Sequence, residues 1–150
     1  MDLILWRHAD AEDGLPDLSR RLTPRGIKQA ERMAAWLLQR LPGKFHVIVS
    51  PAERTKQTAA ALGVSTKTRR ELAPGASVAQ ILNAAEWPDR KGPVVVVGHQ
   101  PDLGRVAAFL LSAQEEDWTL KKGGLWWLTN RVRNAEAQVV LRAAMSPELL

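Results

Sequence analysis

The chain has 150 residues, 45% of them hydrophobic and 25% charged, which is the composition of one soluble globular domain, and we expect a single domain over residues 1–150. The lack of cysteine excludes disulfides, thiolate nucleophiles and cysteine-ligated metals, and it favours a reducing compartment. The formal charge of +5 suits an acidic or phosphorylated partner, whereas dispersed cations and few aromatic residues argue against nucleic acid.

The first predicted element is a buried strand that ends in Arg7 and His8. Four consecutive apolar residues at 3–6 are typical of a central strand in a mostly parallel sheet. Residues 9–22 contain glycine, proline and charges without periodicity, so they are predicted to be a loop. Ligands of open α/β sheets bind beyond the carboxyl ends of the strands, which places Arg7 and His8 at the expected site.

A helix is predicted next, with Thr23 as its N-cap and Pro24 as its first residue. Apolar residues at three- and four-residue spacing make one stripe as far as Leu41. Residues 45–49 are then predicted to be a second buried strand. The following serine and glutamate, Ser50 and Glu53, match a capping box, which predicts a helix as far as residue 62.

The middle of the chain continues the alternation of strands and helices. Residues 64–70 are predicted to be a short strand, and Ser77 is a candidate cap for a helix over 78–86. Four valines at residues 94–97 give the clearest strand in the chain. A fourth helix is expected from Asp102, as its cap, through residue 111.

Two final strands are predicted at residues 125–128 and 137–141, with a turn between them at 130–134. Trp126 and Trp127 then lie on alternate faces of a strand, although a partner-binding surface is the other interpretation. Strands that alternate with helices favour a three-layer α/β/α fold with a mostly parallel central sheet.

Three of the predicted strands end in residues that suit catalysis. The first ends in Arg7 and His8, the second is followed by Ser50 and Arg54, and the fourth is followed by His99. Arginines and histidines around one crevice describe a site for a doubly charged oxyanion, most simply phosphate. A neutral imidazole is a competent nucleophile toward phosphorus, and arginines stabilise the charged transition state.

Other kinds of site receive little support. His46 stands at a strand start without companions and is interpreted as an ordinary surface residue. No histidine or carboxylate pair has metal-ligand spacing, so neither a metal nor a cofactor is predicted. The acidic opening is unlike a signal peptide, and no stretch approaches the roughly 20 apolar residues of a membrane span. We therefore expect a cytoplasmic protein with no membrane partner.

The motifs together resemble the histidine phosphatase superfamily, which has the phosphoglycerate-mutase-like fold. Residues 3–9 resemble its Arg-His-Gly signature, with Ala9 in place of glycine. Residues 22–26 match its Leu-Thr-x-x-Gly pattern, residues 50–59 its second motif, and residues 97–99 its second histidine. The compact length, residues 71–74, residues 98–101 and residues 145–147 are most similar to SixA-type phosphohistidine phosphatases.

The resemblance implies a role for each site residue. It makes His8 the nucleophile, Arg7 and Arg54 phosphate clamps, and His99 a protonated partner that also contacts phosphate. It further implies a phosphate-binding arginine just before the Leu-Thr pair, which by offset is Arg20 with Arg21 as the rival. Gln100 is a further candidate phosphate contact.

The same resemblance points to the substrate. Relatives that act on alkyl phosphates tend to carry a glutamate, as general acid, where this chain has Pro74. An imidazole leaving group needs no such acid, which favours phosphohistidine on a phosphorelay-type protein domain, hydrolysed by a monomer without metal. The alternatives are a small-molecule phosphomonoesterase that uses Glu71 as the acid, with Glu12 and Asp10 as secondary candidates, and a phosphate-binding protein without turnover.

Overall fold

Six strands form one mixed sheet in the computed structural model, which describes all of residues 1–150: β1 (Asp2–Arg7), β2 (His46–Val49), β3 (Lys67–Thr68), β4 (Val94–Gly98), β5 (Leu125–Arg133) and β6 (Glu136–Met145). Their order across the sheet is β3-β2-β4-β1-β5-β6. Strands β3, β2, β4 and β1 pair with one another in parallel. The β5–β6 hairpin is added beside β1 in antiparallel orientation.

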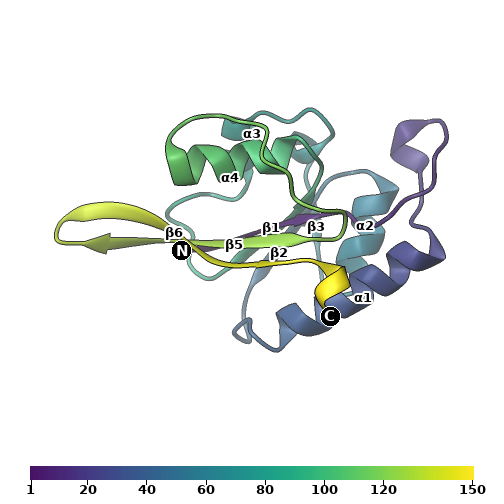
Figure 1. Cartoon of the computed structure of the whole chain (residues 1–150), viewed down its shortest axis with the longest axis horizontal. Helices are drawn as coiled ribbons and strands as arrows, with labels where there is room; N and C mark the ends of the chain where they lie inside the picture. Colours follow the sequence, from purple (N-terminus) through teal and green to yellow (C-terminus); the bar gives the residue numbers. More distant parts are fainter.

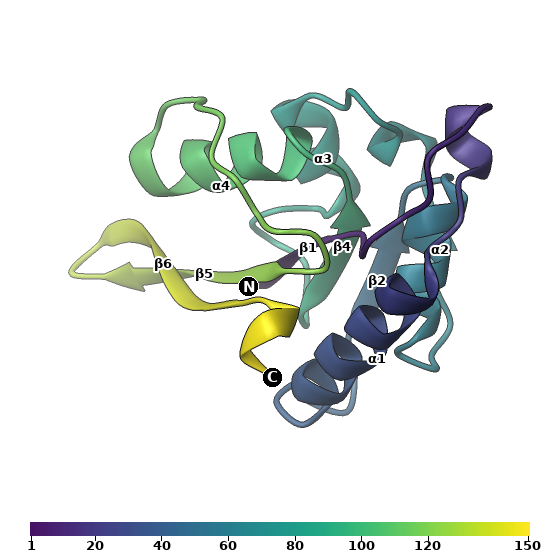
Figure 2. The same cartoon turned by 45° about the vertical axis from the view of Figure 1, so that its right-hand side comes forward.

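Helices cover both faces of this sheet (Figure 1). They are α1 (Pro24–Leu38), α2 (Glu53–Ala60), α3 (Val78–Ala84) and α4 (Asp102–Ser112), with single 3₁₀ turns η1 (Asp17–Ser19), η2 (Arg70–Leu72) and η3 (Pro147–Leu149). Figure 2 shows α3 and α4 on one side of the sheet and α1 and α2 on the other. The expected three-layer α/β/α fold with a mostly parallel sheet is therefore confirmed.

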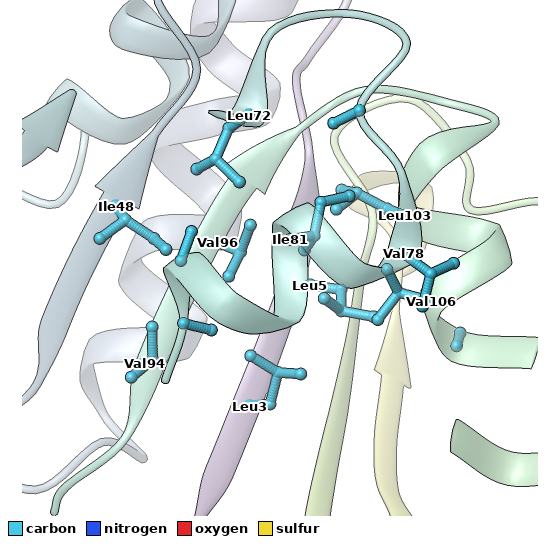
Figure 3. Packing of buried hydrophobic residues seen from close by; sticks show 14 of the residues in the cluster. Leu3, Leu5, Ile48, Leu72, Val78, Ile81, Val94, Val96, Leu103 and Val106 are labelled. Carbon is cyan, nitrogen blue, oxygen red and sulfur yellow. The ribbon is translucent and has the colours of Figure 1, made fainter. Parts of the chain in front are cut away.

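The core follows from alternation along the buried central strands. Leu3 and Leu5 of β1 face the α3–α4 layer (Figure 3), whereas Ile4 and Trp6 pack against the α1–α2 layer. Successive side chains of a strand point to opposite faces, so an apolar run without alternation is what a strand covered on both sides requires. This double burial fixes the position of the residues that follow β1.

Two of the four predicted helix caps are present. The Thr23 hydroxyl accepts a hydrogen bond from the N–H of Gly26 at 3.0 Å. Ser77 begins α3 with a complete capping box, in which Gln80 is the reciprocal partner. In both cases the side-chain oxygen accepts from a backbone N–H of its own first turn, and the Thr23 hydroxyl also donates to the carboxylate of Asp10 at 2.8 Å.

The other two cap predictions were wrong. Helix α2 begins after Ala52 without a side-chain cap, and the Ser50 hydroxyl instead contacts His99. Helix α4 begins after Pro101, and the carboxylate of Asp102 accepts hydrogen bonds from the backbone N–H groups of Gly75 and Ala76. In both cases a partner from a distant segment has taken the side chain that local spacing assigned to a cap.

The strand boundaries differ most at the two edges of the sheet. At one edge, β3 pairs only with β2 and is limited to two residues. At the other, β5 and β6 are longer than predicted, because their exposed halves pair with each other beyond the body of the domain, with the turn at Asn134 and Ala135 (Figure 2). Trp126 packs toward the α3–α4 layer and Trp127 toward the α1–α2 layer, as the alternate-face interpretation requires.

Candidate active site

The two histidines singled out by the sequence lie together at the carboxyl edge of the parallel strands. In the β1–β4 register Arg7 is opposite Gly98, and the N–H of His8 donates to the carbonyl of Gly98 at 3.1 Å. Because the next residue of each strand is a histidine, the rings of His8 and His99 meet with centroids 5.5 Å apart. Both side chains are buried.

The His8 ring is held in one tautomer by the backbone. Its Nδ1 lies 2.8 Å from the carbonyl oxygen of Ala9, and because a carbonyl only accepts hydrogen bonds, Nδ1 must carry the proton. Burial, together with the positive charges of Arg54 and Arg7, lowers the pKa of His8 from 6.5 to about 4. At neutral pH His8 is therefore an uncharged imidazole whose Nε2 lone pair is free for nucleophilic attack.

His99 is held by Arg54 on one ring nitrogen and by Ser50 on the other. The Nη2 of Arg54 is 3.4 Å from His99 Nδ1, and the Ser50 Oγ is 2.7 Å from His99 Nε2. A guanidinium only donates, so Nδ1 accepts and Nε2 carries the proton that is donated to Ser50. Burial, with the charge of Arg54, lowers the pKa of His99 to about 3, so the groups of the protein alone keep it neutral.

Arg54 and Arg7 supply positive charge from two elements. Arg54 stands in the first turn of α2 and is buried, and its two terminal nitrogens bond to Asp17. Arg7 ends β1, and its Nη1 donates to the carbonyl of Leu120 at 2.8 Å. The Nε atoms of both arginines are buried and have no partner in the protein. A buried donor without a partner costs about 1–3 kcal/mol, so each arginine has a donor that the protein alone leaves unsatisfied.

Arg20 approaches the same histidines and Arg21 does not. The Arg20 side chain is only partly exposed, donates from Nε to the Glu12 carbonyl and pairs with Asp17 at 3.1 Å. Its charge also contributes to the lowered pKa of both His8 and His99. Arg21 is exposed, so the geometry favours Arg20 as the third cation of the site.

Gln100 has both ends of its side-chain amide hydrogen-bonded within the protein. Its Oε1 accepts from the N–H of Gly104 at 2.9 Å, and its Nε2 donates to the carbonyl of Trp118 at 2.9 Å. Both ends of the amide thus tie the start of α4 to the chain that precedes β5. Its expected contact with phosphate stays a prediction.

The backbone after His8 accepts the alanine that stands in place of glycine. Ala9 is fully buried, lies outside the left-handed region and packs with Leu22 and Ala30. Its N–H donates to the hydroxyl of Thr58, which itself donates to the carbonyl of Arg54. One threonine of α2 therefore ties the nucleophile segment to the helix that carries the arginine.

Two of the three carboxyl groups considered as acids, those of Glu71 and Asp10, are bonded to cations or hydroxyls. Glu71 is exposed, and its own backbone N–H together with the Arg69 guanidinium holds the pKa of its carboxyl below the ordinary value. Hydrogen bonds from Thr23 and Lys122 do the same for the pKa of Asp10. These acids are ionised at neutral pH and are therefore poor proton donors. Glu12 contributes its backbone carbonyl to Arg20.

The remaining predictions concern residues away from this edge. His46 lies on the surface at the start of β2, where its Nδ1 is 3.2 Å from Arg90. No group of three or more His, Asp or Glu side chains is arranged to ligate a metal. None of the helices has the length and apolar character that a bilayer crossing demands.

Two residues of the site make contacts that the sequence did not predict. Ser50 was expected at the end of the second strand, where it lies, but as a helix cap and not as a hydrogen-bond partner of His99. Asp17 carried no signal, because it belongs to an irregular loop whose path depends on contacts with α2.

Several known proteins are similar to this chain in sequence and in fold. The profile of the histidine phosphatase superfamily (branch 1) matches residues 3–76. A solved SixA protein of Nakamurella multipartita, described as a candidate phosphohistidine phosphatase, is 30% identical with a TM-score of 0.79, covering 97% of this chain and 95% of that one. The protein histidine phosphatase SixA in complex with tungstate is 26% identical with a TM-score of 0.79, covering 99% of both chains.

The fold is also shared more widely. A phosphoserine phosphatase variant of Entamoeba histolytica, in complex with phosphoserine, is 18% identical with a TM-score of 0.70, covering 99% of this chain and 98% of that one. At this identity the likeness concerns the fold alone.

Proposed function

Since the chain belongs to the histidine phosphatase superfamily, and is thereby a phosphatase, we propose that it hydrolyses phosphohistidine on another protein and that Nε2 of His8 carries the phosphoryl group. The observation that carries the proposal is the His8 ring, which is neutral, fixed with its proton on Nδ1, and surrounded by arginines. This is the state that a nucleophilic imidazole requires. The two SixA structures support the choice of substrate.

The proposed reaction has two transfers. In the first, the Nε2 lone pair of His8 attacks phosphorus, the N–P bond of the substrate breaks, and the substrate imidazole leaves. In the second, water attacks the phosphorus on His8, the new N–P bond breaks, and inorganic phosphate is released with His8 restored. The guanidinium groups of Arg7 and Arg54 stay charged throughout and stabilise the negative oxygens of both transition states.

His99 changes its role when phosphate arrives. The positive charges of the arginines oppose its protonation, whereas a phosphoryl dianion beside the ring favours it. We expect His99 to gain a proton as the substrate binds and then to donate a hydrogen bond to a phosphoryl oxygen. The protonated partner implied by the family resemblance is thus a property of the complex with phosphate.

The leaving group decides between the substrate classes. An alkoxide leaves slowly unless an acid protonates it, and that help is worth roughly 10²–10⁴-fold. Imidazole has a pKa near 6.5 and leaves readily in its protonated form. Pro74 stands where relatives tend to have the acid, and Glu71 is ionised beside Arg69. The site is therefore better suited to the N–P bond of a phosphorelay-type domain than to a phosphate monoester.

The test compares substrates directly. Wild-type protein and Glu71→Gln are assayed with a phosphohistidine peptide and with a phosphoserine peptide of the same sequence. We expect the phosphohistidine peptide to be turned over far faster, and Glu71→Gln to leave its rate within about twofold, as an exposed side chain outside the reaction should. Faster turnover of the monoester that Glu71→Gln abolishes would establish the small-molecule alternative, and no turnover of either would favour a binding protein.

A further inference from the structure

The loop between β1 and α1 brings a carboxylate into contact with two arginines of the site. The Oδ2 of Asp17 lies 3.0 Å from Nη2 of Arg54, and its Oδ1 lies 3.1 Å from Nη1 of Arg20. The carbonyl oxygen of Asp17 accepts a further hydrogen bond from Nη1 of Arg54 at 2.8 Å. We propose that Asp17 is a positioning residue, whose carboxylate holds Arg20 beside Arg54 so that both guanidinium groups face one phosphate. This rests on the function proposed above.

The two arginines depend on Asp17 to different degrees. Arg54 is buried in α2 and retains its bond to the Asp17 backbone whichever side chain stands at position 17. Arg20 belongs to the irregular loop, and its other hydrogen bond is to Glu12 of the same loop. The Asp17 carboxylate is therefore the contact that connects the Arg20 side chain to the helical body of the protein.

A carboxylate that bridges two neighbouring arginines reduces their mutual repulsion and fixes their side chains. Arg54 and Arg20 are like charges at one site, and an acid shared between them offsets their repulsion. An arginine side chain also has large rotamer freedom, and an ion pair that fixes it in advance lowers the entropic cost of binding phosphate. Because the hydrogen bond from Arg54 lowers the pKa of Asp17, the bridge stays ionised at neutral pH and is not a proton donor.

A carboxylate at this position is also compatible with the opposite role, in which it weakens phosphate binding. An acid bonded to both arginines can compete with phosphate for them, and removing its charge would then tighten phosphate binding. The observed bonds favour positioning, because each arginine gives Asp17 only part of its donors and the Nε of Arg54 has no partner in the protein. The sign of the change in affinity distinguishes the two roles.

The experiment is a double-mutant cycle on Asp17→Asn and Arg20→Ala, with inorganic phosphate as the probe. Its dissociation constant is measured calorimetrically, and KM and kcat are measured with whichever phosphorylated substrate the protein turns over. Asp13→Asn is the matched control, since Asp13 is an exposed acid of the same loop. Thermal unfolding of each variant confirms that it is folded.

We expect Asp17→Asn to weaken phosphate binding and raise KM by about fivefold, with kcat within about twofold of wild type. In the Arg20→Ala background the same change should have no further effect, because Asp17 acts through Arg20. Tighter phosphate binding, an effect no larger than that of Asp13→Asn, or additive losses in the double variant would each overturn the proposal. Since inorganic phosphate is the probe, a wrong substrate assignment leaves this result interpretable.

Discussion

The hydroxyl oxygen of Ser50 lies 2.7 Å from Nε2 of His99, although 49 positions separate them in the chain. The contact is made where β2 and β4 end side by side, with Val49 opposite Val97 in the sheet. Ser50 also accepts the N–H of Ala52 at 3.2 Å. One buried hydroxyl thereby fixes both the start of the segment that leads to Arg54 and the orientation of the second histidine.

Ser50→Ala should slow catalysis because it removes the acceptor of the His99 Nε2 proton. The ring would lose its fixed orientation, and we expect kcat to fall about tenfold, which corresponds to about 1.4 kcal/mol. Steady-state kinetics of Ser50→Ala and Ser77→Ala test this, because Ser77 caps α3 away from the site. The second variant should lose about 1 kcal/mol of stability and keep its kcat. Equal kcat in both variants would contradict a positioning role for Ser50.

Arg54→Ala should cost about 3 kcal/mol of transition-state stabilisation, or roughly a hundredfold in kcat/KM. Arg54 contacts His99 directly, and its Nε is buried without a partner in the protein. Arg40→Ala is the matched control, since Arg40 lies over the Trp36 ring at the far end of α1. An Arg54→Ala variant with activity within tenfold of wild type would show that another group carries this charge.

Asp102→Ala should destabilise the fold by about 3 kcal/mol, because it leaves two backbone N–H groups without their acceptor. The carboxylate is buried, and burial raises its pKa. Asp117→Ala removes only an exposed ion pair with Arg105 and should cost less than about 1 kcal/mol. Denaturant unfolding of the two variants measures the difference, and similar midpoints would refute the anchoring role of Asp102.

Acid should destabilise the protein through the two buried histidines of the candidate site. Both pKa values are lowered by folding, to about 4 for His8 and about 3 for His99, so between those values and pH 6.5 the unfolded chain binds more protons than the native one. Stability is therefore lost as the pH falls through this window, by up to about 1.4 kcal/mol per pH unit for each histidine. Above pH 6.5 both histidines are neutral in the folded and in the unfolded chain, so they no longer make the stability depend on pH.

The measurement is the free energy of unfolding against pH for wild type, His8→Asn and His99→Asn. Each variant should show a shallower decline than wild type between pH 6.5 and pH 4. Parallel curves would mean that the native rings take up protons as readily as the unfolded chain does.

The meeting of these residues at the carboxyl edge of the parallel strands was predictable, because it depends on features that are local in the sequence. An apolar run without alternation identifies a strand covered on both faces, and the residue after such a strand must lie at its end. That reasoning placed His8, His99 and Arg54 without knowledge of any contact. The helix caps predicted at Thr23 and Ser77 were likewise confirmed, since each caps its own helix.

The sequence predictions that were wrong or missing concern residues whose partners lie in distant segments. Ser50 and Asp102 both match the local pattern of a helix cap, yet each makes its bonds across the fold, to His99 and to residues 75–76. The position of Asp17 follows from the path of an irregular loop, which no periodicity describes. The length of the β5–β6 hairpin depends on pairing between two exposed segments, which leaves little apolar alternation to detect.

The account depends most on covalent phosphate at Nε2 of His8, which can be trapped directly. Wild-type protein, His8→Ala and His46→Ala are mixed briefly with a radiolabelled phosphohistidine peptide, quenched and separated from substrate. Acid-labile label should appear on wild type and on His46→Ala, and it should be missing from His8→Ala. Label retained by His8→Ala, or turnover of the peptide by wild type with no labelled protein at any time, would contradict the mechanism.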